Sequence, residues 1–212
     1  MSNTVGGDQV GIFVSCKGLP SRDLLSKSDP FVIMEVYDAI NQTWVEKART
    51  EVLKDNPNPD FTTQLKMDYC FEEKQILRFQ VFDSDGSSGS LIGDIEGTLG
   101  ELITSSGKTK TGCLYKKNAP MDCSISFRCE EICDLKELLV LRLRGEGLDK
   151  KDLLSKSDPF FEIHRLQADG TSFMVFTSEV IQNTLNPAWE QRRISIQQLC
   201  NNDYSMSRAF SF

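Results

Sequence analysis

The sequence predicts an all-β protein built from two similar antiparallel β-sandwiches in tandem, the second of them incomplete. Three observations lead to this prediction. A nine-residue segment occurs twice, 129 positions apart. Short stretches of alternating apolar and polar residues, separated by turn residues, follow one another along the chain. Helical periodicity is almost absent. This combination is typical of sandwich folds with many short strands.

The repeated segment reads Asp-Leu-Leu-Ser-Lys-Ser-Asp-Pro-Phe and covers residues 23–31 and 152–160. Its flanks are repeated as well, because Thr-Glu-Val at 50–52 returns as Ser-Glu-Val at 178–180, each ahead of an Asn-Pro pair. The repeat is far longer than the roughly 20–50 residues of a solenoid unit. We therefore expect two duplicated domains, one over residues 1–132 and one over residues 136–212.

The expected elements of the first domain follow in order from these patterns. Val10, Ile12 and Val14 alternate with less apolar neighbours and indicate a strand that leads into the first repeated segment. The Ser-Asp-Pro sequence forces an extended or turn conformation and starts the next strand at Phe31. Strands are expected at 10–16, 31–37, 44–52, 61–69, 77–82, 113–116 and 123–129, with a short helical turn at 99–104.

The second domain repeats this order but stops early. Its expected strands cover 139–144, 160–166, 173–181 and 194–199, and the alternating pattern ends after Cys200. The first domain has further strands beyond the corresponding point. We therefore expect the missing strands to leave apolar faces uncovered around Leu141, Leu143, Phe161 and Ile163, with unpaired sheet edges beside them.

The net charge of −7 restricts the classes of partner. It argues against nucleic acid and against constitutive binding to anionic lipid, because both polyanions would be repelled overall. Such a partner would need local positive charge on the protein or a cation from solution. No apolar stretch follows Met1, and no apolar run approaches the ~18 residues of a membrane-spanning helix, so neither a signal peptide nor a transmembrane segment is expected.

The cysteines and the histidine argue for a reduced protein without a zinc site. Seven cysteines at irregular spacing fit free thiols in the cytosol better than a disulfide framework. The only histidine is His164, and no Cys-x-x-Cys pair is present. We expect a cytoplasmic protein.

Two loops of the first domain carry candidate metal ligands. Asp23 and Asp29 bracket the repeated segment, and Asp83 and Asp85 follow the strand at 77–82. If both loops emerge at the same rim of a sandwich, four carboxylates converge, and they repel one another unless a cation bridges them. Ligation by oxygen alone, from flexible loops, suits calcium. The alternative is a surface turn with solvated acids, although such a turn does not require both aspartates of the repeated segment.

The order of these motifs resembles the C2 domain, and the chain as a pair resembles the N-terminal half of a copine. The motifs that carry the resemblance are the two Lys-Ser-Asp-Pro-Phe loops, Arg-Thr-Glu-Val at 49–52, Gly-Thr-Leu-Gly at 97–100, Leu-Asp-Lys-Lys-Asp at 148–152 and Leu-Asn-Pro-Ala-Trp at 185–189. The resemblance implies eight-stranded C2-type sandwiches that bind anionic phospholipid membranes when calcium fills the loops. It also implies recruitment from the cytoplasm to the plasma membrane, and it leaves a nuclear location and protein partners open.

The resemblance also implies which residues bind calcium. Asp23, Asp29, Asp83 and Asp85 match ligand positions of the first domain, and Asp152 and Asp158 match the first-loop pair of the second domain. Two departures stand out. Ser90 occupies a position where the family has a further aspartate. The second domain lacks the Asp-x-Asp loop, and the von Willebrand-type A domain that follows in copines is absent.

Two rival functions compete with calcium-dependent lipid binding. In an enzyme, Asp83 and Asp85 could act as general acid and base, but two residues so close in sequence offer no obvious substrate cleft. His164 has no evident nucleophile beside it, and there is no glycine-rich phosphate loop, so we expect no enzymatic activity. The closer rival is a calcium-independent protein-interaction module in which the loop aspartates only shape turns.

Overall fold

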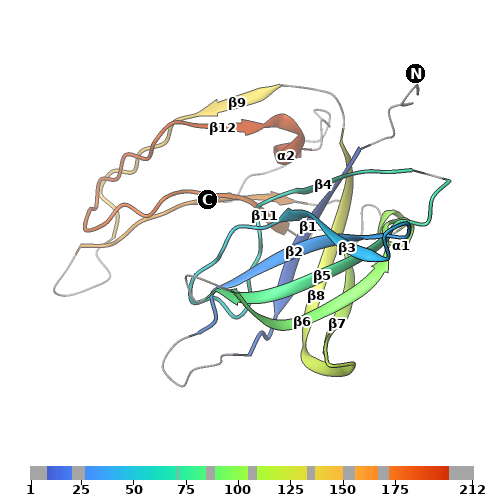
Figure 1. The fold of residues 1–212 in the computed structure, drawn as a ribbon. Coiled ribbons are helices and arrows are strands. Elements are labelled where there is room, and N and C mark those ends of the chain that lie inside the picture. Colours follow the sequence, from blue (N-terminus) through green and yellow to red (C-terminus); the bar gives the residue numbers. More distant parts are fainter. Residues whose placement is uncertain are drawn as a thin grey trace. The chain divides into compact units, whose positions relative to one another are not determined.

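The computed structural model describes residues 9–20, 27–70, 72–84, 89–104, 109–132, 137–149, 156–166 and 172–200. The chain divides into two compact units, Met1–Ile132 and Cys133–Phe212. Each unit is described by itself below, and both are drawn in Figure 1. Among the described helices, none is long and apolar enough to cross a membrane.

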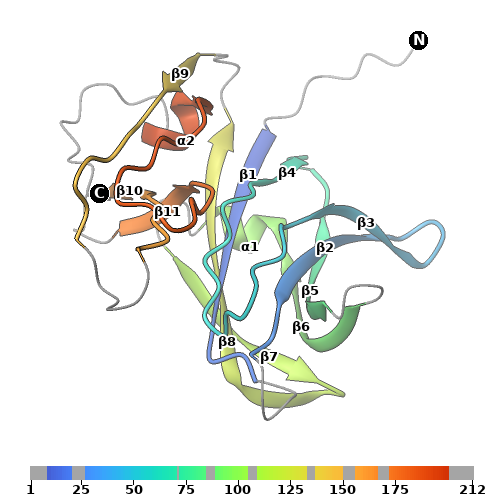
Figure 2. The same cartoon turned by 90° about the vertical axis from the view of Figure 1, so that its left-hand side faces the viewer.

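The first unit is an antiparallel sandwich of eight strands. The strands are β1 (Gln9–Lys17), β2 (Pro30–Asp38), β3 (Thr43–Arg49), β4 (Leu65–Asp68), β5 (Ile76–Ser84), β6 (Gly89–Thr98), β7 (Lys110–Lys116) and β8 (Ala119–Ile132). They follow the hydrogen-bonded order β3-β2-β5-β6-β7-β8-β1-β4. A single residue pair, Asp94 with Tyr115, joins β6 to β7. The order therefore divides there into two layers of four strands, which Figure 2 shows from a second side.

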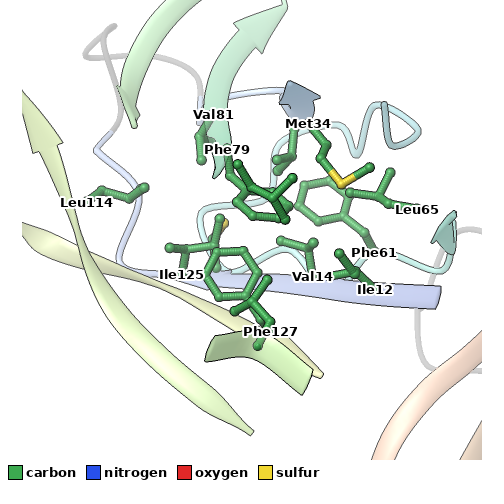
Figure 3. Packing of buried hydrophobic residues seen from close by; sticks show 14 of the residues in the cluster. Ile12, Val14, Met34, Phe61, Leu65, Phe79, Val81, Leu114, Ile125 and Phe127 are labelled. Carbon is green, nitrogen blue, oxygen red and sulfur yellow. The ribbon is translucent and has the colours of Figure 1, made fainter. Parts of the chain in front are cut away.

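The core of the first unit lies between these two layers. The period of two along each strand places alternate apolar residues on the inner face. Ile12 and Val14 of β1 thus pack with Met34 of β2 and Phe79 of β5, as Figure 3 shows. The helical turn expected at 99–104 is α1 (Leu99–Ile103), and its first turn is closed by a reciprocal capping box.

The described part of the second unit consists of four strands and a short helix. β9 (Leu138–Leu141) pairs with β12 (Arg192–Ser195), and β10 (Glu162–Leu166) pairs with β11 (Ser172–Thr177). The strand expected at 194–199 ends at Ser195, because α2 (Ile196–Cys200) begins there. All pairs are antiparallel, as predicted.

The second unit repeats hydrogen bonds of the first half of the first unit at matching positions. The backbone N–H of Gly18 donates to Asn58 Oδ1 at 2.8 Å, and that of Gly147 donates to Asn186 Oδ1 at 2.8 Å. Likewise, the β9–β12 register repeats the β1–β4 register, since Gln9 lies opposite Asp68 and Leu138 lies opposite Ser195. The duplication seen in the sequence is therefore also a duplication of backbone geometry.

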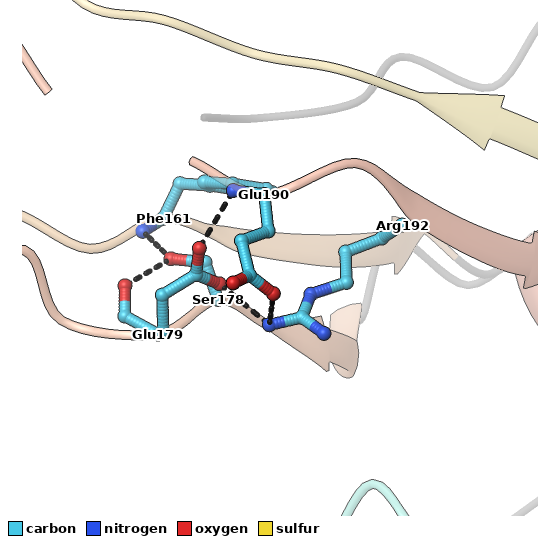
Figure 4. Close-up of polar contacts among 5 residues, drawn as sticks. All are labelled: Phe161, Ser178, Glu179, Glu190 and Arg192. Atoms are coloured by element: carbon cyan, nitrogen blue, oxygen red, sulfur yellow. Dashed lines mark hydrogen bonds and ion pairs between the residues drawn. The ribbon is translucent and has the colours of Figure 1, made fainter. Parts of the chain in front are cut away.

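Each unit has a glutamate two residues after the second strand of its hairpin, Glu51 after β3 and Glu179 after β11, and the two make matching hydrogen bonds. Glu179 accepts hydrogen bonds from the backbone N–H of Glu190 at 2.7 Å and from Arg192 at 2.9 Å (Figure 4). These two hydrogen bonds lower the pKa of Glu179 to about 2, and the bond from the Glu190 backbone has the larger effect. Its counterpart Glu51 accepts the backbone N–H of Thr62 at 2.7 Å. Both glutamates therefore fasten the loop after the hairpin to the segment that precedes the next paired strand.

The expectation of an uncovered apolar face in the second unit was wrong for Ile163. That side chain is only 4% exposed. Ile194 of β12 and Leu199 of α2 pack in the same apolar cluster and cover it. Leu141 and Phe161 lie half-buried at the border of the cluster. The large exposed apolar residues of this unit are instead Leu138, Leu139, Val140, Phe160 and Val180, as far as the described residues extend.

The described cysteines carry free thiols. Burial raises the pKa of Cys16 and raises that of Cys129 to about 12. A thiol with a raised pKa stays protonated near neutral pH and is a poor nucleophile. These cysteines therefore act as small apolar core residues.

Candidate functional site

Asp29 and Asp83 lie together at one rim of the first unit. Asp29 immediately precedes β2, and Asp83 lies near the end of β5, directly opposite Pro30 in the β2–β5 register. The backbone N–H of Asp29 donates to Asp83 Oδ1 at 2.7 Å, and the N–H of Ser84 donates to the carbonyl of Asp29 at 2.9 Å. Two candidate residues that are 54 positions apart in sequence are thus held in direct contact.

A third loop, not predicted as part of the site, meets the same rim. Asp55 has a left-handed backbone with a φ of 51°, and its N–H donates to Asp29 Oδ1 at 2.8 Å. The next residue, Asn56, donates its N–H to the carbonyl of Ser28 at 3.0 Å. Asparagine and aspartate tolerate this conformation better than other residues with a side chain. The Asn-Pro-Asn-Pro sequence at 56–59 indicates a break in the chain, but not the position of the preceding residue beside Asp29.

The cross-strand register also places Ser90. Ser90 lies opposite Asp83 in the β5–β6 pair. Directly opposed residues on neighbouring antiparallel strands have Cβ atoms about 5 Å apart. The position where the related family has an aspartate is therefore beside the Asp83 carboxylate.

We expect Ser90→Asp to tighten calcium binding, because affinity rises with the number of charged ligands. A gain of roughly tenfold in titration calorimetry is expected. Ser126→Asp, at a half-buried hydrogen-bonded serine of β8, serves as a control for added charge alone. Equal or weaker calcium affinity in Ser90→Asp would contradict the assignment of this position.

The remaining candidates of the first unit, Asp23 and Asp85, lie outside the described residues, and so does Asp152 of the second unit. Within the described ranges, no three His, Cys, Asp or Glu side chains form a group that could hold a metal ion. The described part of the site contributes carboxylate oxygens and no nitrogen or sulfur ligand. Such donors fit a hard cation such as calcium rather than zinc.

Asp158 of the second unit repeats only part of this arrangement. Its Oδ1 accepts the backbone N–H of Asn183 at 2.6 Å, as Asp29 accepts that of Asp55. Asn183 also has a left-handed backbone, with a φ of 54°. Among the described residues of this unit, no strand takes the place of β5, so no carboxylate corresponds to Asp83. Within the described residues, the two units therefore share the hydrogen bond to the first-loop aspartate but not a contact with a second aspartate.

An aromatic pair borders the rim in the first unit. Phe31 and Phe82 stack with ring centroids 5.4 Å apart and an interplanar angle of 17°. Gly89 packs against them, and a Cβ atom there would lie 2.9 Å from Phe31 Cζ. A larger residue at the start of β6 would therefore displace the Phe31 ring.

Comparison with known families decides the fold family. The C2 domain profile matches residues 11–114 and 136–205. The chain belongs to the C2 domain family. Both of its C2 segments carry the duplicated aspartate loop described above, and the tandem antiparallel sandwiches expected from the sequence are confirmed.

Solved structures similar to this C2 chain include single and tandem domains. The structure named BON1-C2B is 22% identical, with 63% of this chain and 99% of that chain covered and a TM-score of 0.48. A single C2 domain of plant extended synaptotagmin 1 is 22% identical, with 61% and 98% covered and a TM-score of 0.46. The calcium-bound pair of C2 domains of extended synaptotagmin 2 is 18% identical, with 91% and 74% covered and a TM-score of 0.48.

Proposed function

We propose that the chain is a calcium-dependent phospholipid-binding module of a copine-like protein. The observation that carries the proposal is the contact between Asp29 and Asp83, which brings carboxylates from two loops to one rim of a C2 sandwich. C2 domains generally bind phospholipid membranes, and many bind calcium. The proposed ligands of the first domain are Asp23, Asp29, Asp83 and Asp85.

Calcium would supply positive charge at an acidic rim and open positions for lipid phosphate oxygens. The chain's own residues hold the carboxylates in place, because the N–H groups of Asp29 and Asp55 each occupy one carboxylate oxygen. That leaves the second oxygen of Asp29 and of Asp83 for a cation. Neutralisation of the rim also reduces the local repulsion between a protein of net charge −7 and an anionic leaflet.

The copine-like assignment rests on motifs shared by both domains. We assign the calcium-dependent membrane binding mainly to the first domain. Asp152 and Asp158 of the second domain are proposed as weaker calcium ligands. The proposed location is the cytoplasm with calcium-driven recruitment to the plasma membrane. Catalysis and nucleic-acid binding are not part of the proposal. His164 lies 2.8 Å from Glu162 on β10, and we propose a structural role for it.

The second candidate is a calcium-independent protein-interaction module. It is favoured by the same hydrogen bonds, because Asp29 and Asp83 each use one oxygen to stabilise the loops. In that case the aspartates are needed for backbone geometry, and calcium is not.

The test is co-sedimentation of the whole chain with vesicles of equal phosphatidylserine and phosphatidylcholine, in calcium and in chelator. We expect calcium to increase the bound fraction at least about tenfold and to raise the melting temperature of the protein, because the ion binds only the folded loops. Identical binding and identical melting curves in the two conditions would favour the interaction module instead.

A further inference from the structure

The β9–β12 sheet of the second unit has an inner and an outward face. Ile194, which is 2% exposed, lies opposite Leu139, so both side chains are on the face toward the apolar cluster. Successive residues of a strand point to opposite faces. Leu138, Val140 and Arg193 therefore lie on the outward face, with Arg193 directly opposite Val140.

The outward face is apolar at one end, in contrast to the matching face of the first unit. Leu138 and Val140 are 53% and 54% exposed. The corresponding residues of β1 are Gln9 and Gly11, and Gln9 donates a hydrogen bond to Asp68 at 2.7 Å. Two large apolar side chains thus stand where the otherwise equivalent sheet has a glutamine and a glycine.

The charged residues near this face also differ from the residues at the matching positions of the first unit. Arg142, Arg144 and Arg193 are all exposed. The corresponding residues of the first unit are Phe13, Ser15 and Lys66. Leu138, Val140 and Arg193 of the sheet, together with the two arginines that follow β9, Arg142 and Arg144, define what we call the β9–β12 face.

The arginines of the β9–β12 face are only loosely held by the described residues. Arg142 donates to Gln191 at 3.4 Å. Arg144 and Glu146 are 3.7 Å apart, with their side chains 80% and 75% exposed. Contacts of this length between solvated groups contribute little. Glu190 borders the same region but pairs with Arg192 at 3.5 Å.

We propose that the β9–β12 face is a second, calcium-independent contact for an anionic phospholipid surface. The contact uses no aspartate loop, so it goes beyond the calcium-dependent function proposed above. Arginine guanidinium groups pair well with phosphate oxygens. Leu138 and Val140 can enter the headgroup region beside them, as apolar residues of interfacial segments do. Because the Debye length is about 8 Å in physiological salt, acidic residues far from the face are largely screened, and Glu146 and Glu190 beside it offset only part of its charge.

A lipid surface fits the two ends of the face better than an acidic polypeptide does. A phospholipid surface presents phosphates and acyl chains side by side. The arginines and apolar residues of this face are also adjacent to one another, since Val140 lies opposite Arg193. The C2 family generally binds phospholipid membranes as well. A soluble acidic polypeptide would match the arginines but not the exposed leucine and valine.

The experiment measures binding of the whole chain in chelator, at physiological ionic strength, to vesicles of phosphatidylcholine alone and of equal phosphatidylserine and phosphatidylcholine. Binding is expected only to the anionic vesicles. The triple variant R142Q/R144Q/R193Q should reduce that partition roughly 100-fold. The control K47Q/K54Q/K66Q removes the same charge from exposed lysines of the first unit and should change it less than about threefold.

A second pair of variants tests the apolar end. Val140→Thr should weaken the chelator-resistant binding, whereas Val180→Thr, at a side chain of the same 54% exposure in the same unit, should leave it unchanged. Absence of wild-type binding in chelator, or equal losses in the two triple variants, would overturn the inference. Binding to soluble poly-glutamate without binding to vesicles would overturn it too. None of these outcomes touches the calcium-dependent increment, which tests the proposed function separately.

Discussion

Asp83→Asn should abolish the calcium-dependent increment of vesicle binding while leaving the fold intact. The amide keeps the oxygen that accepts the Asp29 backbone N–H at 2.7 Å, so the loop geometry is preserved. It removes one ligand charge from the rim. Changes in the residues that merely orient metal ligands already cost about 10–100-fold in affinity, so loss of a ligand charge should weaken calcium binding by at least about 100-fold. Co-sedimentation in calcium and in chelator measures the effect.

The matched control for this variant is Asp68→Asn. Asp68 lies opposite Gln9 at the start of β1, whereas the aspartate rim follows the other end of that strand. The control removes the same charge and keeps the acceptor oxygen for Gln9. It should retain the full calcium response. If Asp83→Asn keeps full calcium-dependent binding and its melting temperature in chelator is unchanged, Asp83 is not a calcium ligand. The calcium site would then lie elsewhere.

Phe61→Ala should destabilise the first unit by about 4 kcal/mol, the range observed when a buried aromatic residue is truncated. Phe61 is 1% exposed, and its ring fills the space between the two layers (Figure 3). The truncation removes apolar contact area and leaves a cavity that close-packed neighbours cannot fill. A loss of this size should shift the urea midpoint of the first unit down by roughly 2 M.

The two tryptophans allow each unit to be followed by itself. Trp44 lies on β3 of the first unit and Trp189 lies in the second unit. In a Trp189→Phe background, Trp44 fluorescence reports on the first unit alone. Ile40→Ala, at a side chain of the first unit that is 93% exposed, is the control and should cost less than about 0.5 kcal/mol. An unchanged midpoint for Phe61→Ala would mean that the core is not packed as described.

The sequence alone was sufficient for most features that depend on local order, although it predicted a strand where α2 (Ile196–Cys200) lies. Alternating residues such as Ile12 and Val14 identified strands, because side chains on a strand have a fixed period of two. The duplicated nine-residue segment identified the tandem organisation, because a repeat of this length does not arise by chance in a chain of 212 residues. The acidic character of Asp29 and Asp83 and their positions at strand ends were also readable without coordinates.

Only the tertiary structure decided which residues are neighbours across strands. The contact between Asp29 and Asp83, the position of Ser90 opposite Asp83, and the arrival of Asp55 at the rim all depend on pairing between distant segments. A shift of register by one residue would reverse each face, and local sequence does not specify the partner strand. The same non-local packing buries Ile163 beneath Leu199, against expectation. It also places Val140 beside Arg193 on an open face, because the register of β9 with β12 sets which side chains stand together.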